Sequence, residues 1–373
     1  MRSIGYLLFF CGLHAASAAD VTTDLSTLMK RIIWISRNGS HNLEFNPDVI
    51  LSTPEIITKA GYPAEAHVVM TEDGYLLTLH RIPGGNDSLP VLLQHGILGS
   101  SADWVILGKG KALGFSCILA YLLADQGYDV WLGNFRGNTY SKAHISLSPS
   151  NSTFWDFSFN ELGIYDLPAM ITFITKKRSQ PLHTYIGHSM GTTTFYVMSS
   201  ERPEITGMVK LMISLAPTAF INHMRSPIRY LIPFWKMFQA LQPVILNHDP
   251  AGTSAKTLTH YTQIIKSGKF CQYDYGHEKN QLIYNLTEPP NYNLENIMVP
   301  VALVYSKNDW LISTEDVKKL YHLLPNVVDM YEVPWSSFNH IDFLWANDAP
   351  KLVYERILKI MRNEKPSNLT SME

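Results

Sequence analysis

From residue 65 onward, short apolar runs rich in β-forming residues alternate with longer stretches that suit a helix. The first two runs flank Asp73-Gly74, a dipeptide typical of a hairpin turn. Strand and helix in repetition predict a mostly parallel sheet covered by helices on both faces. Strands are expected at residues 67–70, 75–80, 91–93, 129–132, 183–186, 209–215, 301–305 and 327–333, with helices at 117–126 and 167–177 among them.

The alternation stops between Pro217 and Pro300, where the sequence suits loops and helices and offers no strand. Within this segment, residues 230–238 are apolar on nearly all sides. We expect the segment to be an insertion that sits over the sheet as a helical cap. Composition agrees with one large catalytic domain carrying such an insertion, because 46% of the 373 residues are hydrophobic and only 17% are charged.

The N-terminus has the pattern of a secretory signal peptide. Arg2 precedes an apolar run at residues 4–13, and small residues follow at 15–19. About ten apolar residues are too few to cross a membrane core of ~30 Å, so we expect cleavage after Ala18 or Ala19 and no transmembrane segment. The expected division is a signal peptide at 1–19, core at 20–217, cap insertion at 218–299, core again at 300–362 and a polar tail at 363–373.

Other features bear on compartment and partners. Two cysteines remain in the mature chain, Cys117 and Cys271, and the sequence leaves open whether they form a bridge. The net charge of -2 and the lack of a Lys/Arg cluster argue against nucleic acid as a partner. Secretion predicts glycosylation at the Asn-x-Ser/Thr sequons, which are Asn38, Asn86, Asn151, Asn285 and Asn368.

The pentapeptide at 187–191, Gly-His-Ser-Met-Gly, matches the G-x-S-x-G motif of a nucleophile elbow. Such a match has a chance probability on the order of a tenth in a chain of this length, so a β-turn serine is the alternative. The motif, however, directly follows the predicted strand at 183–186 and precedes a helix-compatible run at 192–199, which is the strand–turn–helix order that the elbow requires. We therefore predict that Ser189 is a nucleophile.

A serine nucleophile needs a general base, usually a histidine oriented by a carboxylate, and in this fold the chain order is Ser, acid, His. His340 is favoured as the base because it follows the last predicted strand in a loop. The other histidines after Ser189 fall in the insertion or on a predicted surface helix; they are His223, His248, His260, His277 and His322.

Asp309 is favoured as the acid because it follows the predicted strand at 301–305, where strand ends place side chains at the carboxyl edge of the sheet. Glu315 and Asp316 compete, but they begin the next helix and suit capping. Asp342 is too close in sequence to His340 to orient its ring easily.

An oxyanion hole needs two backbone N–H donors. One is expected from Met190, the residue after the nucleophile, and one from the loop at 95–99, where we assign Ile97 with Leu98 as a neighbouring alternative. His95 is expected to hold this turn rather than to act as a base. The chemistry predicted is acyl transfer, which needs no metal and no cofactor.

Several longer stretches resemble the acid lipase family. They are residues 94–98, 127–134, 136–138, 165–169, 187–193, 250–254, 267–270 and 339–346, and the resemblance covers nearly the whole mature chain. It implies the α/β-hydrolase fold and hydrolysis of triacylglycerols or sterol esters at lipid–water interfaces, with Ser189, Asp309 and His340 matching the family triad. It also implies a secreted protein, alternatively a lysosomal one, and we expect a monomer.

Two departures from the family stand out. Met190 replaces the glutamine usual in the mammalian members. This change should leave the oxyanion hole intact, because the residue contributes its backbone N–H. The segment between Phe220 and Asp249 is shorter than the family's cap, which puts a movable lid in doubt. A carboxylesterase with a truncated cap that acts on short soluble esters therefore remains as an alternative. A catalytically silent lipid-binding homologue is a second alternative, against which the intact Ser189, Asp309 and His340 argue.

Overall fold

The computed structural model describes residues 51–108, 118–226 and 252–362. The signal peptide, Asn38, Asn368, Cys117, His248, the apolar run at 230–238 and the polar tail lie outside these residues. Within them, the chain forms one nine-stranded sheet with the order β1-β2-β4-β3-β6-β7-β8-β9, and β5 pairs with β2. The strands are β1 Glu65–Met70, β2 Tyr75–Ile82, β3 Pro90–Gln94, β4 Asp129–Leu132, β5 Ala143–His144, β6 Thr184–His188, β7 Met212–Leu215, β8 Val301–Tyr305 and β9 Val327–Glu332.

The predicted mostly parallel sheet is confirmed. Every neighbouring pair from β4 to β9 is parallel, and β1, β2 and β5 form an antiparallel end. The β1–β2 turn contains Gly74 at a φ of 93°, a left-handed conformation that a glycine adopts without strain. Strand β7 begins at Met212, three residues later than expected, because Val209 makes only an isolated bridge to Leu182. The two-residue strand β5 carries no sequence signal and was not predicted.

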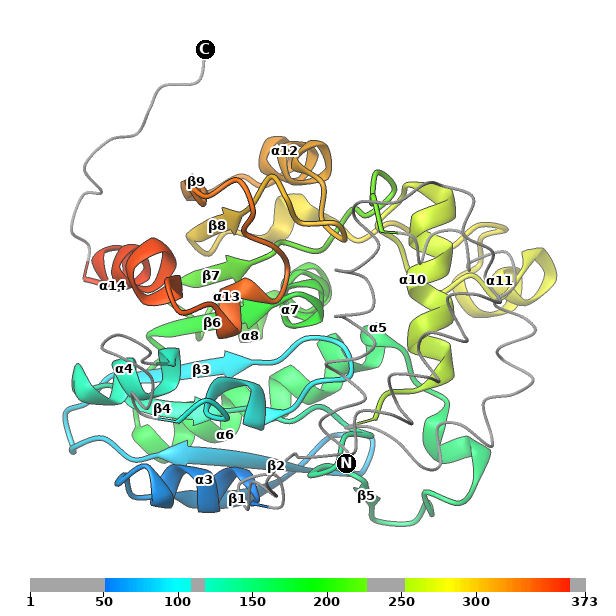
Figure 1. Cartoon of the computed structure of the whole chain (residues 1–373). Coiled ribbons are helices and arrows are strands. Elements are labelled where there is room, and N and C mark those ends of the chain that lie inside the picture. The colour runs from blue at the N-terminus through cyan, green and yellow to red at the C-terminus, as the bar shows by residue number, and fades with distance from the viewer. Residues whose placement is uncertain (1–50, 109–117, 227–251, 363–373) are drawn as a thin grey trace, which may run out of the picture.

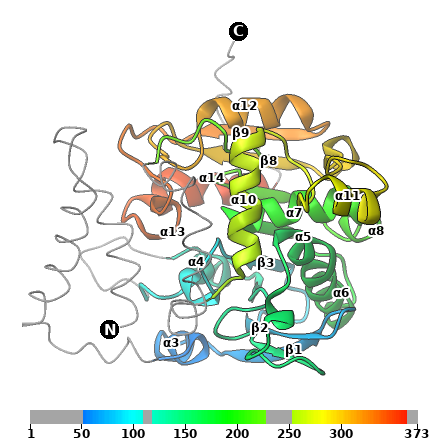
Figure 2. The ribbon, with the colours of Figure 1, turned by 90° about the vertical axis from the view of Figure 1, so that its right-hand side faces the viewer.

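Helices cover both faces of this sheet (Figures 1 and 2). Figure 2 shows α3, α4, α13 and α14 on one side of it and α6 and α8 on the other. Bounds are α3 Thr53–Lys59, η2 Ser101–Trp104, α4 Leu119–Asp125, η3 Ser152–Trp155, α5 Phe159–Glu161, η4 Leu162–Asp166, α6 Leu167–Arg178, α7 Met190–Glu201, α8 Pro203–Thr206, α10 Ala255–Ser267, α11 His277–Tyr284, η6 Leu294–Asn296, α12 Thr314–Leu323, α13 Asp342–Trp345, η7 Pro350–Tyr354 and α14 Glu355–Met361.

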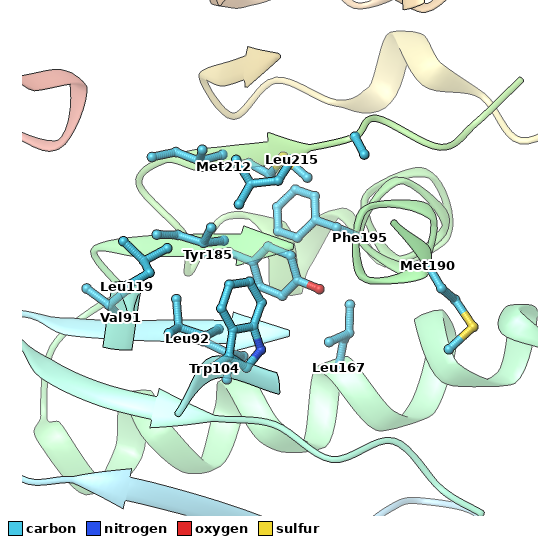
Figure 3. Close-up of a cluster of buried hydrophobic side chains, with 14 of the residues drawn as sticks. Val91, Leu92, Trp104, Leu119, Leu167, Tyr185, Met190, Phe195, Met212 and Leu215 are labelled. Carbon is cyan, nitrogen blue, oxygen red and sulfur yellow. The ribbon is translucent and has the colours of Figure 1, made fainter. Parts of the chain in front are cut away.

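Buried side chains lie on both faces of the sheet, and those between the sheet and α7 include aromatic and aliphatic residues in contact (Figure 3). Tyr185 of β6 and Phe195 of α7 lie side by side with ring centroids 4.6 Å apart. The Tyr185 hydroxyl then donates to the carbonyl of Gly191 at 2.6 Å. A core residue thus reaches from the middle of strand β6 to the start of the following helix.

The described parts of the insertion, residues 218–226 and 252–299, contain α10, α11 and η6 and no strand, with one isolated bridge between Cys271 and Asn291. In Figure 1, α10 stands to the right of the sheet, on the side toward which the arrows of β3, β6 and β7 point. These helices suit the expected helical cap, whose bounds stay a prediction, and residues 227–249 of the shortened segment lie outside the described residues. Among the described residues, no helix is long and apolar enough to cross a bilayer.

A buried ion network joins segments that lie far apart in sequence. The guanidinium of Arg136, which is 2% exposed, contacts the carboxylates of Asp73 at 2.5 Å and Asp166 at 2.6 Å. It also lies over the ring of Tyr75, 3.9 Å from the centroid. Its neighbour Phe135 contacts the loop after β3, so the network braces the strand ends.

Replacing Arg136 should therefore be costly. In Arg136→Met, Asp166 becomes an unpaired buried charge, and we expect a loss of about 3–5 kcal/mol in the free energy of unfolding at neutral pH, measured by urea denaturation. Lys269→Met is the control, because its pair with Glu288 is exposed to solvent and should contribute little to stability. Equal losses in the two variants would show that the network is not a main support.

Candidate active site

Ser189 stands at a sharp turn between β6 and α7, as predicted. Its φ of 52° and ψ of -118° lie outside the regions that a non-glycine residue normally adopts. The Ser189 N–H donates to the carbonyl of Leu215 on β7 at 3.0 Å. The Ser189 carbonyl accepts from the N–H and the hydroxyl of Thr192 at 2.8 and 2.7 Å. These bonds hold the serine in its strained conformation.

The two motif glycines allow this turn to close. A Cβ on Gly187 would lie 2.7 Å from the backbone of Gly191, and a Cβ on Gly191 would lie 2.4 Å from the carbonyl oxygen of Gln94. Neither contact is possible for real atoms, so any side chain at these positions would push the elbow away from β3. The glycines thus permit close approach of three backbone segments.

The three residues predicted as a triad come together. His340 Nε2 lies 2.9 Å from Ser189 Oγ, and His340 Nδ1 lies 2.8 Å from Asp309 Oδ2. Ser189 and His340 are each 7% exposed and Asp309 is 2% exposed. A base within hydrogen-bond distance of a hydroxyl, oriented by a buried carboxylate, can remove the hydroxyl proton.

Hydrogen bonds hold the acid and its loop in place. Asp309 Oδ1 accepts from the N–H groups of Leu311 and Ile312 at 2.8 and 2.9 Å, which leaves Oδ2 for His340. Backbone carbonyls of the loop that carries His340 accept from the loop that carries Asp309. Ser306 Oγ donates to Phe338 O, and Asn308 Nδ2 donates to Ser337 O at 3.0 Å.

The competing acids are engaged elsewhere. Asp316 accepts from the backbone N–H of His223 at 3.0 Å and lies 2.8 Å from its ring Nδ1. Glu315 lies 3.6 Å from the same ring. Asp342 Oδ2 accepts from the N–H of Asn339 at 2.7 Å.

The other histidines are also distant from this arrangement. His260 is buried in α10 with its Nε2 2.9 Å from the carbonyl of Cys271. His277 and His322 are exposed at the start of α11 and near the end of α12.

The loop after β3 contacts the elbow through Gly96, where a Cβ would lie 3.2 Å from Ser189 Cβ. The Gly96 carbonyl accepts from His95 Nδ1 at 2.7 Å and from the N–H of Gly99 at 3.2 Å. Because the peptide bond is trans, these bonds direct the N–H of Ile97 to the opposite side. Leu98 has a φ of 61°, which is typical of the third position of such a turn.

His95 holds the turn as expected. Its Nε2 accepts from the N–H of Phe135 at 3.2 Å, so the proton resides on Nδ1. Burial lowers the pKa of His95 to about 4. Burial, and secondarily the nearby His340, lowers the pKa of His188 to about 3. Both rings are therefore neutral above about pH 4 and add no charge beside the triad.

Sequence reasoning missed the residues that connect the elbow to the cap. Thr192 Oγ1 accepts from the N–H of Thr218 after β7 at 2.8 Å, and Thr193 Oγ1 donates to the Thr218 carbonyl at 2.6 Å. The hydroxyl of Tyr261 on α10 donates to Thr193 Oγ1 at 2.9 Å. The signal that was available was three consecutive threonines after the elbow in a helix that otherwise packs into the core.

The remaining predicted sites have the following surroundings. Asn86, Asn151 and Asn285 are exposed, as a glycosylated asparagine must be. Cys271 is buried and is a free thiol among the described residues. Its pairing with Cys117 stays open because Cys117 is outside them.

Comparisons with known proteins agree with this geometry. The model of the α/β hydrolase fold matches residues 90–345, and that of the partial α/β-hydrolase lipase region matches residues 53–108. Lipase 1 of Drosophila melanogaster is 41% identical, covering 84% of this chain and 80% of its own length. Human gastric triacylglycerol lipase is 36% identical over 86% of this chain and 93% of its own. Lysosomal acid lipase/cholesteryl ester hydrolase of Macaca fascicularis is 35% identical over 89% and 96%.

Among solved structures, an esterase from Pyrococcus furiosus has a TM-score of 0.51 and 17% identity, covering 82% of this chain and 93% of that chain. At this identity the likeness concerns the fold alone. The predicted α/β-hydrolase fold is thereby confirmed.

The contact at Gly191 generates a test of the elbow. Gly191→Ala should force β3 and the elbow apart, lowering stability by about 1–3 kcal/mol and slowing the reaction of Ser189 with a fluorophosphonate. Gly207→Ala is the control, since its added Cβ would meet nothing closer than 3.6 Å. If Gly191→Ala reacts as fast as Gly207→Ala, the close approach at the elbow does not matter for the nucleophile.

Proposed function

The chain belongs to the acid lipase family of α/β-hydrolases and is a carboxylic ester hydrolase, and from this premise we propose that it cleaves neutral lipids with Ser189 as nucleophile. The resemblance predicted from the motifs is thus confirmed at the level of the family. The catalytic residues, the lipid class and the compartment are our proposal.

The observation that carries the proposal is the hydrogen-bonded series from Ser189 through His340 to Asp309. In the proposed mechanism, Ser189 Oγ attacks the ester carbonyl while His340 Nε2 takes its proton, and Asp309 stabilises the imidazolium. The tetrahedral intermediate collapses, and His340 returns the proton to the departing alcohol. His340 then deprotonates water, which attacks the acyl-enzyme, and His340 returns this proton to Ser189 Oγ as the carboxylic acid leaves.

We assign the oxyanion hole to the N–H groups of Met190 and Ile97. Met190 is the first residue of α7, so its N–H has no partner within the helix, and the helix dipole favours negative charge there. The Ile97 N–H is directed by the two bonds that hold the Gly96 carbonyl. Each such donor contributes roughly 2.7–4 kcal/mol in a well-studied serine hydrolase. No metal or cofactor enters these steps.

The proposed substrates are triacylglycerols or sterol esters at a lipid–water interface. Two relatives named for such substrates, the human gastric triacylglycerol lipase and the macaque cholesteryl ester hydrolase, align with most of this chain. Secretion, with a lysosomal destination as the alternative, is proposed from the signal peptide and from the same relatives. The short segment at 220–249 is the reason to keep a carboxylesterase as the alternative.

A substrate panel with a nucleophile variant tests the proposal. The enzyme should hydrolyse emulsified triolein or cholesteryl oleate, and Ser189→Ala should lower the rate by roughly 10⁴- to 10⁶-fold, as in other serine hydrolases. Titration of released fatty acid measures both. Ser199→Ala on the same helix is the control, because its buried hydroxyl has no hydrogen-bond partner among the described residues.

The outcomes separate the alternatives. Hydrolysis of p-nitrophenyl acetate without activity on the emulsions would identify a carboxylesterase. A folded protein that neither hydrolyses any ester nor reacts with a fluorophosphonate would be the silent lipid-binding homologue.

Secretion has its own test. Expression in a secreting eukaryotic cell should release a protein beginning at Ala19 or Asp20, established by N-terminal sequencing. Peptide N-glycosidase should lower its mass, and Asn86→Gln or Asn151→Gln should remove one glycan each, since both side chains are exposed. An unglycosylated full-length protein retained in the cytosol would contradict the proposal.

A further inference from the structure

His188, the variable residue before the nucleophile, makes a contact across the active site. Its ring Nε2 lies 2.8 Å from the backbone carbonyl oxygen of His340, a residue 152 positions later. The two imidazole rings lie 4.9 Å apart between centroids. His188 is 3% exposed, so this contact is shielded from water.

The direction of the bond follows from the chemistry of its partners. A carbonyl oxygen can only accept, so His188 Nε2 carries the proton and donates it. The other ring nitrogen, Nδ1, faces the loop after β3, where a Cβ on Gly96 would lie 3.2 Å away. The ring therefore fills the space between that loop and the loop of His340.

The position of His188 itself is well determined. It is the last residue of β6, paired with Leu215 of β7, and the strained Ser189 follows directly. The contacts of Ser306 and Asn308 with the His340 loop come from the side of the acid. His188 contacts the same loop from the segment that carries the nucleophile. The loop of His340 is therefore bonded both to the segment of Ser189 and to the segment of Asp309.

We propose that His188 is a positioning residue, which holds the backbone of His340 so that its ring stays within reach of Ser189. This inference rests on the proposed function, because it concerns the same serine and base. A displacement of about 1 Å in a reacting group can lower a rate about 100-fold, so one buried hydrogen bond to the base loop can matter for catalysis.

Neutrality suits His188 to this role. When His340 takes the serine proton it becomes a cation, and a second cation in the adjacent ring would oppose that step. Burial keeps His188 uncharged above about pH 3, so its N–H is available to the carbonyl without adding charge.

Two substitutions at this position test the proposal. His188→Phe keeps a ring of similar size and removes the donor, and we expect kcat for p-nitrophenyl butyrate to fall roughly 10- to 100-fold with KM within about twofold of wild type. His188→Gln carries an amide N–H near the place of Nε2, and we expect it to stay within about tenfold of wild type. Labelling by a fluorophosphonate should slow in the same order.

His260→Phe is the matched control. It removes the same kind of bond, from a buried ring Nε2 to the carbonyl of Cys271, and also the contact of Nδ1 with Ser158 Oγ at 3.1 Å, at a place outside the triad. It should lower the melting temperature at least as much as His188→Phe while changing kcat per folded molecule less than about twofold.

Each outcome decides a different claim. If wild type is labelled but His188→Phe is labelled equally fast, or if His260→Phe loses as much kcat as His188→Phe, the positioning role is wrong and the proposed function stands. If His188→Gln is no better than His188→Phe, the donor is not what matters. A folded wild type that is neither labelled nor active would overturn the proposed function itself.

Discussion

The backbone of Ser189 is the constraint on which the active site depends. A non-glycine residue at a φ of 52° costs about 1–3 kcal/mol and persists only where its surroundings enforce it. Here Leu215 accepts the serine N–H, and Thr192 donates to the serine carbonyl. From the core, the hydroxyl of Tyr185 donates to the carbonyl of Gly191 and so holds the start of α7. The strained backbone of Ser189 is therefore stabilised by contacts from β7, α7 and Tyr185 of β6. As a result, the Ser189 hydroxyl projects from the edge of the sheet.

A second constraint is the orientation of the loops at the sheet edge, which is set by hydrogen bonds to their backbone carbonyls. Parallel strands end at one edge of the sheet, which brings the loops after β3, β6, β8 and β9 together but does not orient them. Orientation comes from side chains that donate to loop carbonyls, namely His95 to Gly96, Asn308 to Ser337 and His188 to His340. Each donor lies within two residues of a residue that we propose for the reaction. The loops that carry the proposed catalytic groups are thus held partly through their backbone carbonyls.

The sequence predicts the elements and the proposed catalytic side chains because both depend on local pattern. The strand before Asp309 is a continuous apolar run, the strand before Ser189 is a short run rich in β-forming residues, and the motif glycines lie within two residues of the serine. The contacts of His188 could not be predicted, since they join positions 152 residues apart and the motif leaves this position free. Likewise, the positive φ of Leu98 could not be predicted, because a leucine gives no indication of a left-handed backbone conformation. What periodicity cannot supply is the pairing of polar groups between distant loops.

The cap helix α10 is attached to the same framework. Its Tyr261 donates to Thr193, which in turn donates to the carbonyl of Thr218 beside the elbow. At its start, Ser254 Oγ donates to the carbonyl of Phe157 and accepts from the N–H of Thr257, which caps the helix. A helix bonded at its start to the loop of Phe157 and at its middle to helix α7 has little freedom to move as a unit. We therefore regard α10 as fixed relative to the elbow.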